Sequence, residues 1–215
     1  MSSPIIVALD MDQKGVTVEP IITLAGDHDV NQVIFNNAEA EVNNRIGDEG
    51  EGWTVAKYLL EFERGGSSAS ARSFKAINLA KSLAKEISDN GQPLLSYPSY
   101  IKRLAELELR TQALQYTELR SLSAMKEGAS PGPESSMAKN LATDLQQDIT
   151  EIALDIIGYY GTPKQENTIG SNAIPLGSKK YLTQASRYQN SRAASIYGGS
   201  REVQKNIIAK AVLGL

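Results

Sequence analysis

The chain has 215 residues, 41% of them hydrophobic, and a formal net charge of −3. It is long enough to bury the core of one ordinary domain, or of one domain with part of another. The acidic balance, with no Lys/Arg-rich run, excludes the electrostatic attraction on which binding to nucleic acids and anionic membranes depends.

The residue types available for chemistry are few. The sequence contains no Cys and one His, which excludes disulfides, thiolate nucleophiles and the usual Ser-His and His-rich metal sites, so no metal is expected. Neither of the glycine-rich phosphate motifs, G-x-G-x-x-G after a strand or G-x-x-x-x-G-K-[ST], is present. Any chemistry must therefore use carboxylates or a bound cofactor.

No stretch of the sequence approaches the roughly 20 apolar residues that a membrane helix needs. The N-terminal MSSPIIVALD lacks the basic start and the long apolar core of a signal peptide. We therefore expect a cytoplasmic protein, with neither a membrane nor a nucleic acid as its partner.

The N-terminal part of the sequence carries a strand signature. Short apolar or alternating runs at residues 4–9, 15–18 and 33–35 predict about three strands. Three strands can hardly close a barrel or cover both of their faces, so this segment should need a sheet from elsewhere.

From residue 50 onward the pattern changes to helical periodicity. The first helical segment should run over residues 53–88, with an interruption at Gly65-Gly66. The residues Asp89-Asn90-Gly91, followed by Pro93, are a stop signal, in which we expect Gly91 to supply a left-handed C-terminal cap.

A second helix is expected over residues 100–125, where Glu106 and Arg110 have the i,i+4 spacing of a favourable ion pair. A third helix should begin at Pro133, because proline is preorganised for a first helical turn. This helix has the cleanest apolar stripe of the chain, at steps of four and three: Met137, Leu141, Leu145, Ile149, Ile152 and Ile156.

A loop rich in Gly, Pro and Asn over residues 158–177 precedes two shorter helices, expected at residues 179–195 and 200–213. Long amphipathic helices joined by short breaks describe an up-and-down bundle. The predicted fold is therefore mainly α, a four-helix-type bundle of roughly four to five helices preceded by a small β fragment.

Two segments could carry chemistry. Glu61 and Glu63 flank Phe62, so they differ by about 200° around a helix axis and do not form a paired-carboxylate site. Taken alone, Glu63-Arg64 is a charged stretch of an amphipathic helix. The run Tyr197-Gly198-Gly199-Ser200 is different in kind, because two glycines before a helix allow close backbone approach by a ligand, although they also suit a tight turn.

These segments, in this order, resemble the acyl-CoA dehydrogenases. Residues 16–18, 23–28, 33–35, 44–47 and 50–53 are similar to the end of that family's middle β-domain and its junction with the C-terminal helices. The most specific match is the ending Ile196-Tyr197-Gly198-Gly199-Ser200-Arg201-Glu202-Val203-Gln204, which resembles the family's C-terminal signature.

The resemblance implies two domains. Residues 1–46 would be the C-terminal fragment of a β-barrel middle domain, and residues 47–215 the C-terminal helical-bundle domain. It does not extend to the family's N-terminal helical domain or to the first part of its β-domain, which includes segments that hold the flavin ring.

Similarity to this family implies FAD as cofactor and an acyl-CoA thioester as substrate. In the family's reaction a carboxylate removes the pro-R α-proton while the β-hydride goes to N5 of FAD, which gives a trans-2-enoyl-CoA. An electron-transfer flavoprotein then reoxidises the flavin; an acyl-CoA oxidase, which uses O₂ directly, stays open. A Glu suits the first step, because the α-proton is weakly acidic and the base must be desolvated, with a raised pKa.

The resemblance also assigns roles to residues. The family's base is either the residue after the signature Tyr, here Gly198, or a Glu immediately before an Arg on the first long helix, here Glu63. Since glycine cannot act as a base, the matching implies Glu63. By the same matching Glu61, Phe62, Arg64, Tyr197, Gly198 and Gly199 line the acyl-CoA site, and Ser200, Arg201 and Glu202 approach FAD.

Two departures concern FAD contacts that this family makes from a neighbouring subunit. The usual Arg-x-x-Phe-Gly is here Ile87-Ser88-Asp89-Asn90-Gly91, without the Arg and the Phe. The usual Gln-x-x-Gly-Gly is here Asp155-Ile156-Ile157-Gly158-Tyr159, which leaves Gly158 as a cofactor-binding candidate. We therefore expect a homo- or hetero-oligomer, including a mixed oligomer in which another chain completes the sites.

The alternative to an enzyme is a non-catalytic helical assembly subunit of such a mixed oligomer. Glu63 discriminates between the two readings, because a purely structural descendant has no reason to retain that carboxylate.

Overall fold

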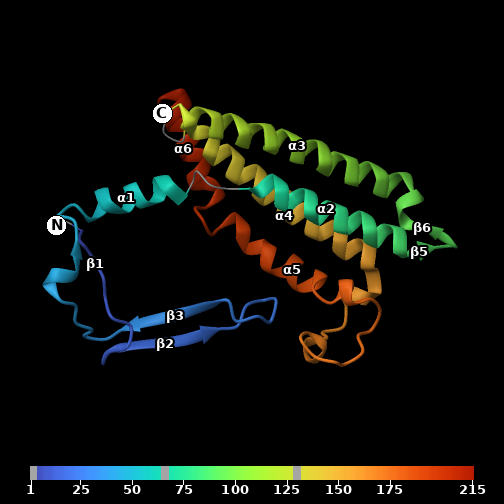
Figure 1. Ribbon diagram of the computed structural model, residues 1–215, viewed down its shortest axis with the longest axis horizontal. Coiled ribbons are helices and arrows are strands. Elements are labelled where there is room, and N and C mark those ends of the chain that lie inside the picture. Colours follow the sequence, from blue (N-terminus) through green and yellow to red (C-terminus); the bar gives the residue numbers. More distant parts are fainter. Residues whose placement is uncertain (1–3, 64–67, 128–131) are drawn as a thin grey trace. The chain divides into compact units, whose positions relative to one another are not determined.

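The computed structural model describes residues 4–63, 68–127 and 132–215, without the side chains of residues 61–63 and 166. The chain divides into two compact units, residues 1–66 and 67–215 (Figure 1). Helix α1 (Gly52–Glu63) belongs to the first unit, together with four strands and a short 3₁₀ helix over residues 42–44, and the remaining described elements belong to the second.

The first unit is built on an antiparallel hairpin. Strand β2 (Val16–Ile21) pairs with β3 (Val30–Phe35), with Val16 opposite Phe35 and Ile21 opposite Val30. Gly15 precedes the hairpin with a φ of 92°, and a Cβ at this position would collide with the Asn36 carbonyl oxygen. Glycine at this position is therefore a steric requirement.

A second, shorter strand pair joins β1 (Ile6–Val7) to β4 (Arg45–Ile46). Three of these four strands overlap the runs that the sequence marks as strands, although β2 and β3 are longer than predicted, and β4 lies outside those runs. Short 3₁₀ helices also connect the described elements of the chain: η1 (Val42–Asn44), η2 (Leu94–Ser96), η3 (Gly158–Gly161), η4 (Glu166–Thr168), η5 (Lys179–Tyr181) and η6 (Arg192–Ser195).

The β2–β3 hairpin has apolar side chains on both faces, and most of them are exposed. Val18 and Val33 lie opposite each other on one face, and Ile21 and Val30 on the other. All four are exposed, as is Phe35, which is 59% accessible. In the described part of the chain, this hairpin therefore lacks the covering layer that a stable sheet needs.

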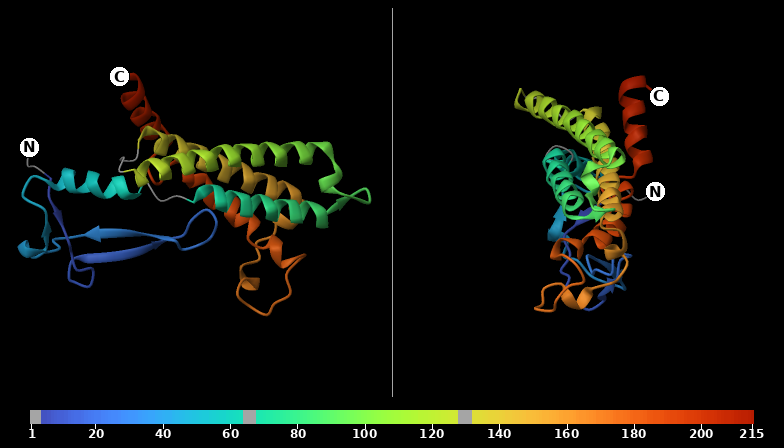
Figure 2. Two further views of the ribbon diagram at one scale, coloured as in Figure 1. Left: turned by 45° about the horizontal axis from the view of Figure 1, so that its top comes forward. Right: turned by 90° about the vertical axis from the view of Figure 1, so that its right-hand side faces the viewer.

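The second unit is organised around one central helix. Helix α4 packs against all of the other four, and Figures 1 and 2 show α2, α3 and α4 side by side. The five helices are α2 (Ala69–Glu86), α3 (Pro98–Lys126), α4 (Pro133–Ile157), α5 (Gln184–Ser191) and α6 (Arg201–Leu213). The mainly helical fold class with a small strand fragment is confirmed.

The predicted apolar stripe of α4 forms the middle of the core. Its last four members are buried in one cluster with Ile77 and Leu83 of α2 and with Leu104, Leu107 and Leu114 of α3: Leu145, Ile149, Ile152 and Ile156. Leu141 is partly buried, and Met137, in the second turn, is half exposed. The stripe therefore holds the bundle together over the C-terminal two thirds of the helix.

The chain stops α2 by a means that the sequence analysis did not predict. Ile87 follows α2 in an extended conformation, and β5 (Ser88–Asp89) then pairs with β6 (Gln92–Pro93). Asn90 and Gly91 connect these strands with φ angles of 48° and 78°, the signature of a type I′ hairpin turn. Gly91 is left-handed as expected, but as a turn residue and not as the cap of α2.

Two other expectations need correction. Among the described side chains, Arg110 pairs with Asp148 of α4 at 2.6 Å and not with Glu106, which lies 3.9 Å from Lys102. The helix expected over residues 179–195 is divided into η5, α5 and η6, with Leu182 and Thr183 between the first two. The α4 start at Pro133 and the α6 start after Ser200 agree with the predictions.

The first turn of α2 is capped by a side chain from another helix. A carboxylate oxygen of Glu118, on α3, accepts hydrogen bonds from the backbone N–H groups of Ala69 at 2.9 Å and Ser70 at 3.3 Å. Because a helix N-terminus carries unsatisfied donors and a partial positive charge, this carboxylate stabilises the end of α2 and ties it to α3.

None of the helices in the described ranges combines the length and apolarity that crossing a bilayer requires.

Replacing Ile152 with Ala should lower the free energy of unfolding by about 2–5 kcal/mol, because this fully buried side chain would leave a cavity in the core. Met137→Ala, on the same helix but half exposed, is the matched control and should cost about 1 kcal/mol or less. Urea unfolding followed by circular dichroism measures both changes. Equal losses for the two variants would contradict the central role of α4 in the core.

Candidate functional site

The site residues expected from the sequence fall in three places. Residues 61–63 form the last turn of α1 in the first unit, and only their backbone is described. Arg64 lies outside the described residues. The segment from Tyr197 to Glu202 contains the turn before α6 and the first residues of that helix, and Gly158 lies at the C-terminus of α4.

The turn formed by Tyr197, Gly198 and Gly199 is open to solvent on one side and packed on the other. All three residues are exposed, Tyr197 to 55%. Gly198 and Gly199 both have positive φ, at 65° and 89°. A Cβ on Gly198 would lie 3.9 Å from Cε of Lys139, whereas a Cβ on Gly199 would overlap the side-chain amide of Gln204. The turn therefore requires glycine most strictly at Gly199.

Helix α6 begins directly behind this turn with its N-terminal donors organised. The Ser200 hydroxyl oxygen accepts a hydrogen bond from the Val203 N–H at 3.3 Å, which is the geometry of an N-cap. The backbone N–H of Glu202 and then the Ser200 hydroxyl hold the pKa of the Glu202 carboxyl below its usual range. The guanidinium of Arg201 forms an ion pair with Asp144 of α4.

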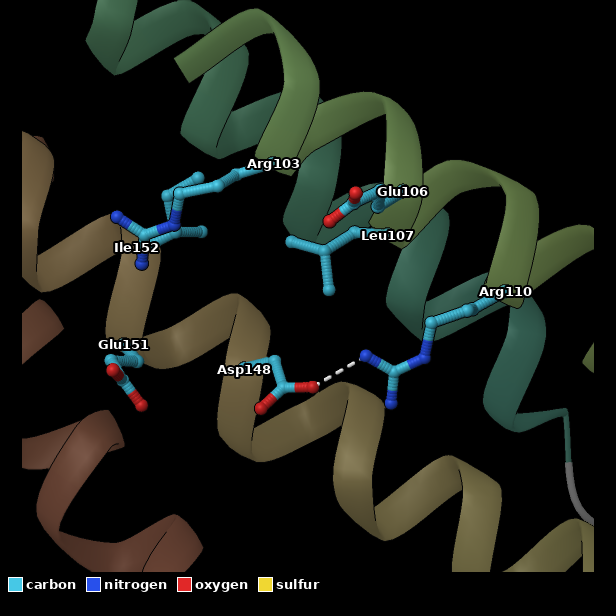
Figure 3. A pocket seen from close by; sticks show the side chains of 7 residues that line it. All are labelled: Arg103, Glu106, Leu107, Arg110, Asp148, Glu151 and Ile152. Carbon is cyan, nitrogen blue, oxygen red and sulfur yellow. Dashed lines mark hydrogen bonds and ion pairs between the residues drawn. The ribbon is translucent and has the colours of Figure 1, made fainter. Parts of the chain in front are cut away.

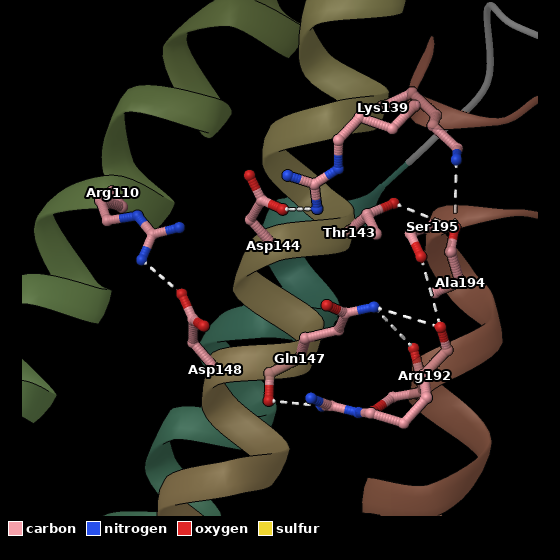
Figure 4. A network of polar contacts seen from close by, with 11 residues as sticks. Arg110, Lys139, Thr143, Asp144, Gln147, Asp148, Arg192, Ala194 and Ser195 are labelled. Carbon is pink, nitrogen blue, oxygen red and sulfur yellow. Dashed lines mark hydrogen bonds and ion pairs between the residues drawn. The ribbon is translucent and has the colours of Figure 1, made fainter. Parts of the chain in front are cut away.

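A row of polar side chains on α4 faces η6 and the turn, and the sequence analysis did not identify it (Figure 4). We call Lys139, Thr143, Gln147 and Thr150 the polar ladder of α4. Lys139 Nζ donates to the Ala194 carbonyl oxygen at 3.0 Å, and Thr143 Oγ1 donates to the same atom at 3.4 Å. The only signal in the sequence is the spacing of four, four and three, which also describes a solvated helix face.

Lys139 is the member of the ladder closest to the turn. Its ammonium group is partly buried, and this burial, followed by the charge of Arg201, lowers the pKa of Lys139, while Glu202 opposes the shift. The structure thus brings Lys139 together with Gly198, Arg201 and Glu202, three of the residues expected at the site.

Gly158 is not part of this arrangement within one chain. It caps α4 with a φ of 51° and begins η3. Lys139 and Gly158 are near opposite ends of α4, roughly 28 Å apart at 1.5 Å per helical residue. A ligand held by the turn before α6 therefore lies far from Gly158 of the same chain.

A shallow groove between α3 and α4 carries none of the expected site residues (Figure 3). Leu107 and Ile152 form its floor, since both are buried. Its two arginines are paired, Arg110 with Asp148 at 2.6 Å and Arg103 with Asp155 at 2.8 Å. The groove is the solvated seam between two helices that are joined by ion pairs.

Gly199→Ala should lower the free energy of unfolding by about 1–3 kcal/mol, because a φ of 89° is strained for alanine and its Cβ would displace the buried Gln204 amide. Gly198→Ala should cost only about 1 kcal/mol, because it adds strain without a clash. Thermal unfolding of both variants provides the comparison. A larger loss for Gly198→Ala would show that the packing behind the turn differs from the one described.

The chain has clear relatives among known proteins. The family model described as "Acyl-CoA dehydrogenase, C-terminal domain" matches residues 50–213. Acyl-CoA dehydrogenase IpdE1 from Mycolicibacterium smegmatis is 33% identical over 208 residues, covering 95% of this chain and 47% of that protein. IpdE1 from Mycobacterium tuberculosis is 30% identical over 213 residues, covering 95% of this chain and 49% of that protein. The chain spans about half the length of these curated relatives.

Solved structures show the same fold. A chain of the ChsE4–ChsE5 complex from Mycobacterium tuberculosis has a TM-score of 0.80 at 23% identity, covering 98% of this chain and 53% of that chain. Butyryl-CoA dehydrogenase from Megasphaera elsdenii has a TM-score of 0.75 at 21% identity, covering 97% of this chain and 51% of that chain. Because the family model matches well over half of its residues, the chain belongs to the acyl-CoA dehydrogenase family.

Proposed function

We propose that this chain supplies the C-terminal half of an FAD-dependent acyl-CoA dehydrogenase, with Glu63 as the base that removes the α-proton of an acyl-CoA thioester. The observation that carries the proposal is the exposed turn at Tyr197, Gly198 and Gly199, directly before the capped N-terminus of α6. Residues 1–46 then belong to the end of the β-domain of the complete enzyme, and residues 47–215 to its helical domain.

The choice of Glu63 rests on the two positions that the family uses for its base. One of them is occupied here by Gly198, which has no side chain to accept a proton. At the other, Glu63 accepts the proton from Cα, while the electrons of the broken Cα–H bond form the new double bond to Cβ. Hydrogen bonds to the thioester carbonyl stabilise the negative charge that develops on its oxygen.

The residues around α6 fit one part of an FAD site. The exposed backbone of Gly198 and Gly199, next to the positive N-terminal end of α6, suits an electron-rich ligand group. Ser200, Arg201 and Glu202 would lie against it, with Arg201 already oriented by Asp144. When bound, FAD supplies the acceptor for the hydride that leaves Cβ.

The other part of the family's FAD contact does not fit this chain. The position of the family's Arg and Phe is occupied by Ile87 and Asn90, next to and within the β5–β6 hairpin. Of the two glycines in the family's Gln-x-x-Gly-Gly, this chain keeps one, Gly158, at the end of α4. We therefore propose that a second, different chain completes the FAD sites in a mixed oligomer, and that an electron-transfer flavoprotein accepts the electrons.

The departures from the family's Arg-x-x-Phe-Gly and Gln-x-x-Gly-Gly also favour the alternative function. In it, the chain is a non-catalytic subunit that assembles with a homologous catalytic chain. The ChsE4–ChsE5 structure, which has the same fold, is a complex of two differently named components. Under this alternative the turn before α6 keeps its packing role, and Glu63 has no chemical role.

The test is the visible spectrum of the purified protein, alone and mixed with candidate partner chains, before and after anaerobic addition of an acyl-CoA. Flavin absorbance should bleach, and Glu63→Gln should slow the bleaching by roughly 10²–10⁴-fold, the usual contribution of a general base. Glu106→Gln, which replaces an exposed glutamate of α3, is the control and should bleach like the wild type.

Two results would contradict the proposal. A protein that takes up no FAD with any partner would leave the assembly role as the function of this chain. A coloured complex that bleaches equally fast with Glu63→Gln would remove Glu63 as the base. Consumption of O₂ without an added acceptor would assign the reaction to an oxidase.

A further inference from the structure

The polar ladder of α4 binds backbone carbonyls at the end of α5 and in η6. The last carbonyls of a helix have no intrahelical partner, so they need donors from elsewhere. Ala194 O receives Lys139 Nζ and Thr143 Oγ1, and Gln147 Nε2 donates to Ser191 O at 3.2 Å and Arg192 O at 3.4 Å. Side chains of α4 thus cap the segment that leads into the turn.

Arg192 makes the reverse connection. Its guanidinium donates to the Gln147 carbonyl oxygen at 2.9 Å and to Thr150 Oγ1 at 3.2 Å, and it stacks 4.2 Å from the centre of the Tyr188 ring. Because donors point in both directions between α4 and η6, the position of η6 along α4 is fixed.

The turn itself is held from two sides. Lys139, which is bonded to Ala194, lies directly behind Gly198. From α6, the Gln204 amide donates to the Gly198 carbonyl oxygen at 3.4 Å and is 4% exposed. Lys139 stays partly buried beside Arg201, although burial and a second cation both disfavour its charge.

We infer that Lys139 and Gln204 are positioning residues that fix the backbone of Tyr197, Gly198 and Gly199 against the thioester of the substrate. The inference rests on the proposed function, in which this turn contacts the reacting end of acyl-CoA. Neither side chain needs to touch the substrate, since Gln204 acts through the carbonyl of Gly198 and Lys139 acts through the carbonyl of Ala194.

The expected kinetic consequence is specific. A turn that is displaced by a fraction of an ångström still binds acyl-CoA, but it holds the thioester in a less reactive geometry. Loss of either side chain should therefore lower kcat on the order of 10–100-fold with little change in KM.

The experiment compares Lys139→Met, Lys139→Arg and Gln204→Leu in the active complex. Lys139→Met keeps the aliphatic length and removes the donor, so it should lower kcat; Lys139→Arg keeps a donor and should restore most of the rate. Lys81→Met is the matched control, because Lys81 is also a partly buried lysine, bonded to Glu108 at 2.6 Å between α2 and α3. It should leave kcat unchanged.

Amide hydrogen exchange gives a second measurement that does not depend on catalysis. Lys139→Met and Gln204→Leu should accelerate exchange over residues 194–199, whereas Lys81→Met should not. Unchanged exchange and unchanged kcat in Lys139→Met would overturn the inference, as would equal losses of kcat in Lys139→Met and Lys139→Arg. If the wild-type complex never bleaches with acyl-CoA, the proposed function fails, and exchange alone decides whether Lys139 and Gln204 hold the turn.

Discussion

The packing of α4 on four other helices is the constraint on which the second unit depends. A helix surrounded in this way has little solvated surface, so its polar side chains must find partners within the protein. Towards α2 and α3 it presents Leu145, Ile152 and their neighbours, and towards η6 it presents the polar ladder, whose donors bind backbone carbonyls. The same helix therefore supplies both the core of the bundle and the support of the candidate site. Among the described residues, Ser136 carries the buried side-chain hydroxyl of α4 that has no hydrogen-bond partner.

Retained and lost family features lie at opposite ends of the second unit. The N-terminal end of α4 carries Lys139, which supports the turn before α6 and the Ser200 cap. Gly158 lies at the other end of α4. There the ion pair between Asp155 and Arg103 joins α4 to the start of α3, which follows the β5–β6 hairpin. The features that match the family's C-terminal signature thus share one end, and the departures from its cross-subunit FAD contacts share the other. In the proposed mixed oligomer, this separation lets one chain contribute part of the cofactor site while another chain completes the rest.

The sequence predicts this fold well where the signals are local. Pro133 and Ser200 start helices as expected, because their effects depend on the adjacent backbone alone. Arg110 was assigned to Glu106 because the sequence shows neighbours within one helix but not the closer Asp148 of α4. The polar ladder was missed for a related reason: polar residues at helical spacing suggest solvent unless the carbonyls they bind are known. For the site, the glycine turn could be identified from its residues, whereas the roles of Glu63 and of the residues around it come from the resemblance to the family.

The uncovered β2–β3 hairpin has a consequence for the behaviour of the protein in solution. In the described part of the chain, β2 and β3 pair only with each other, so the outer edge of each strand is free. Free edges with apolar side chains on both faces promote strand addition between molecules, which is the first step of aggregation. Covering Val33, Ile34 and Phe35 would therefore protect the chain from self-association as well as complete its sheet.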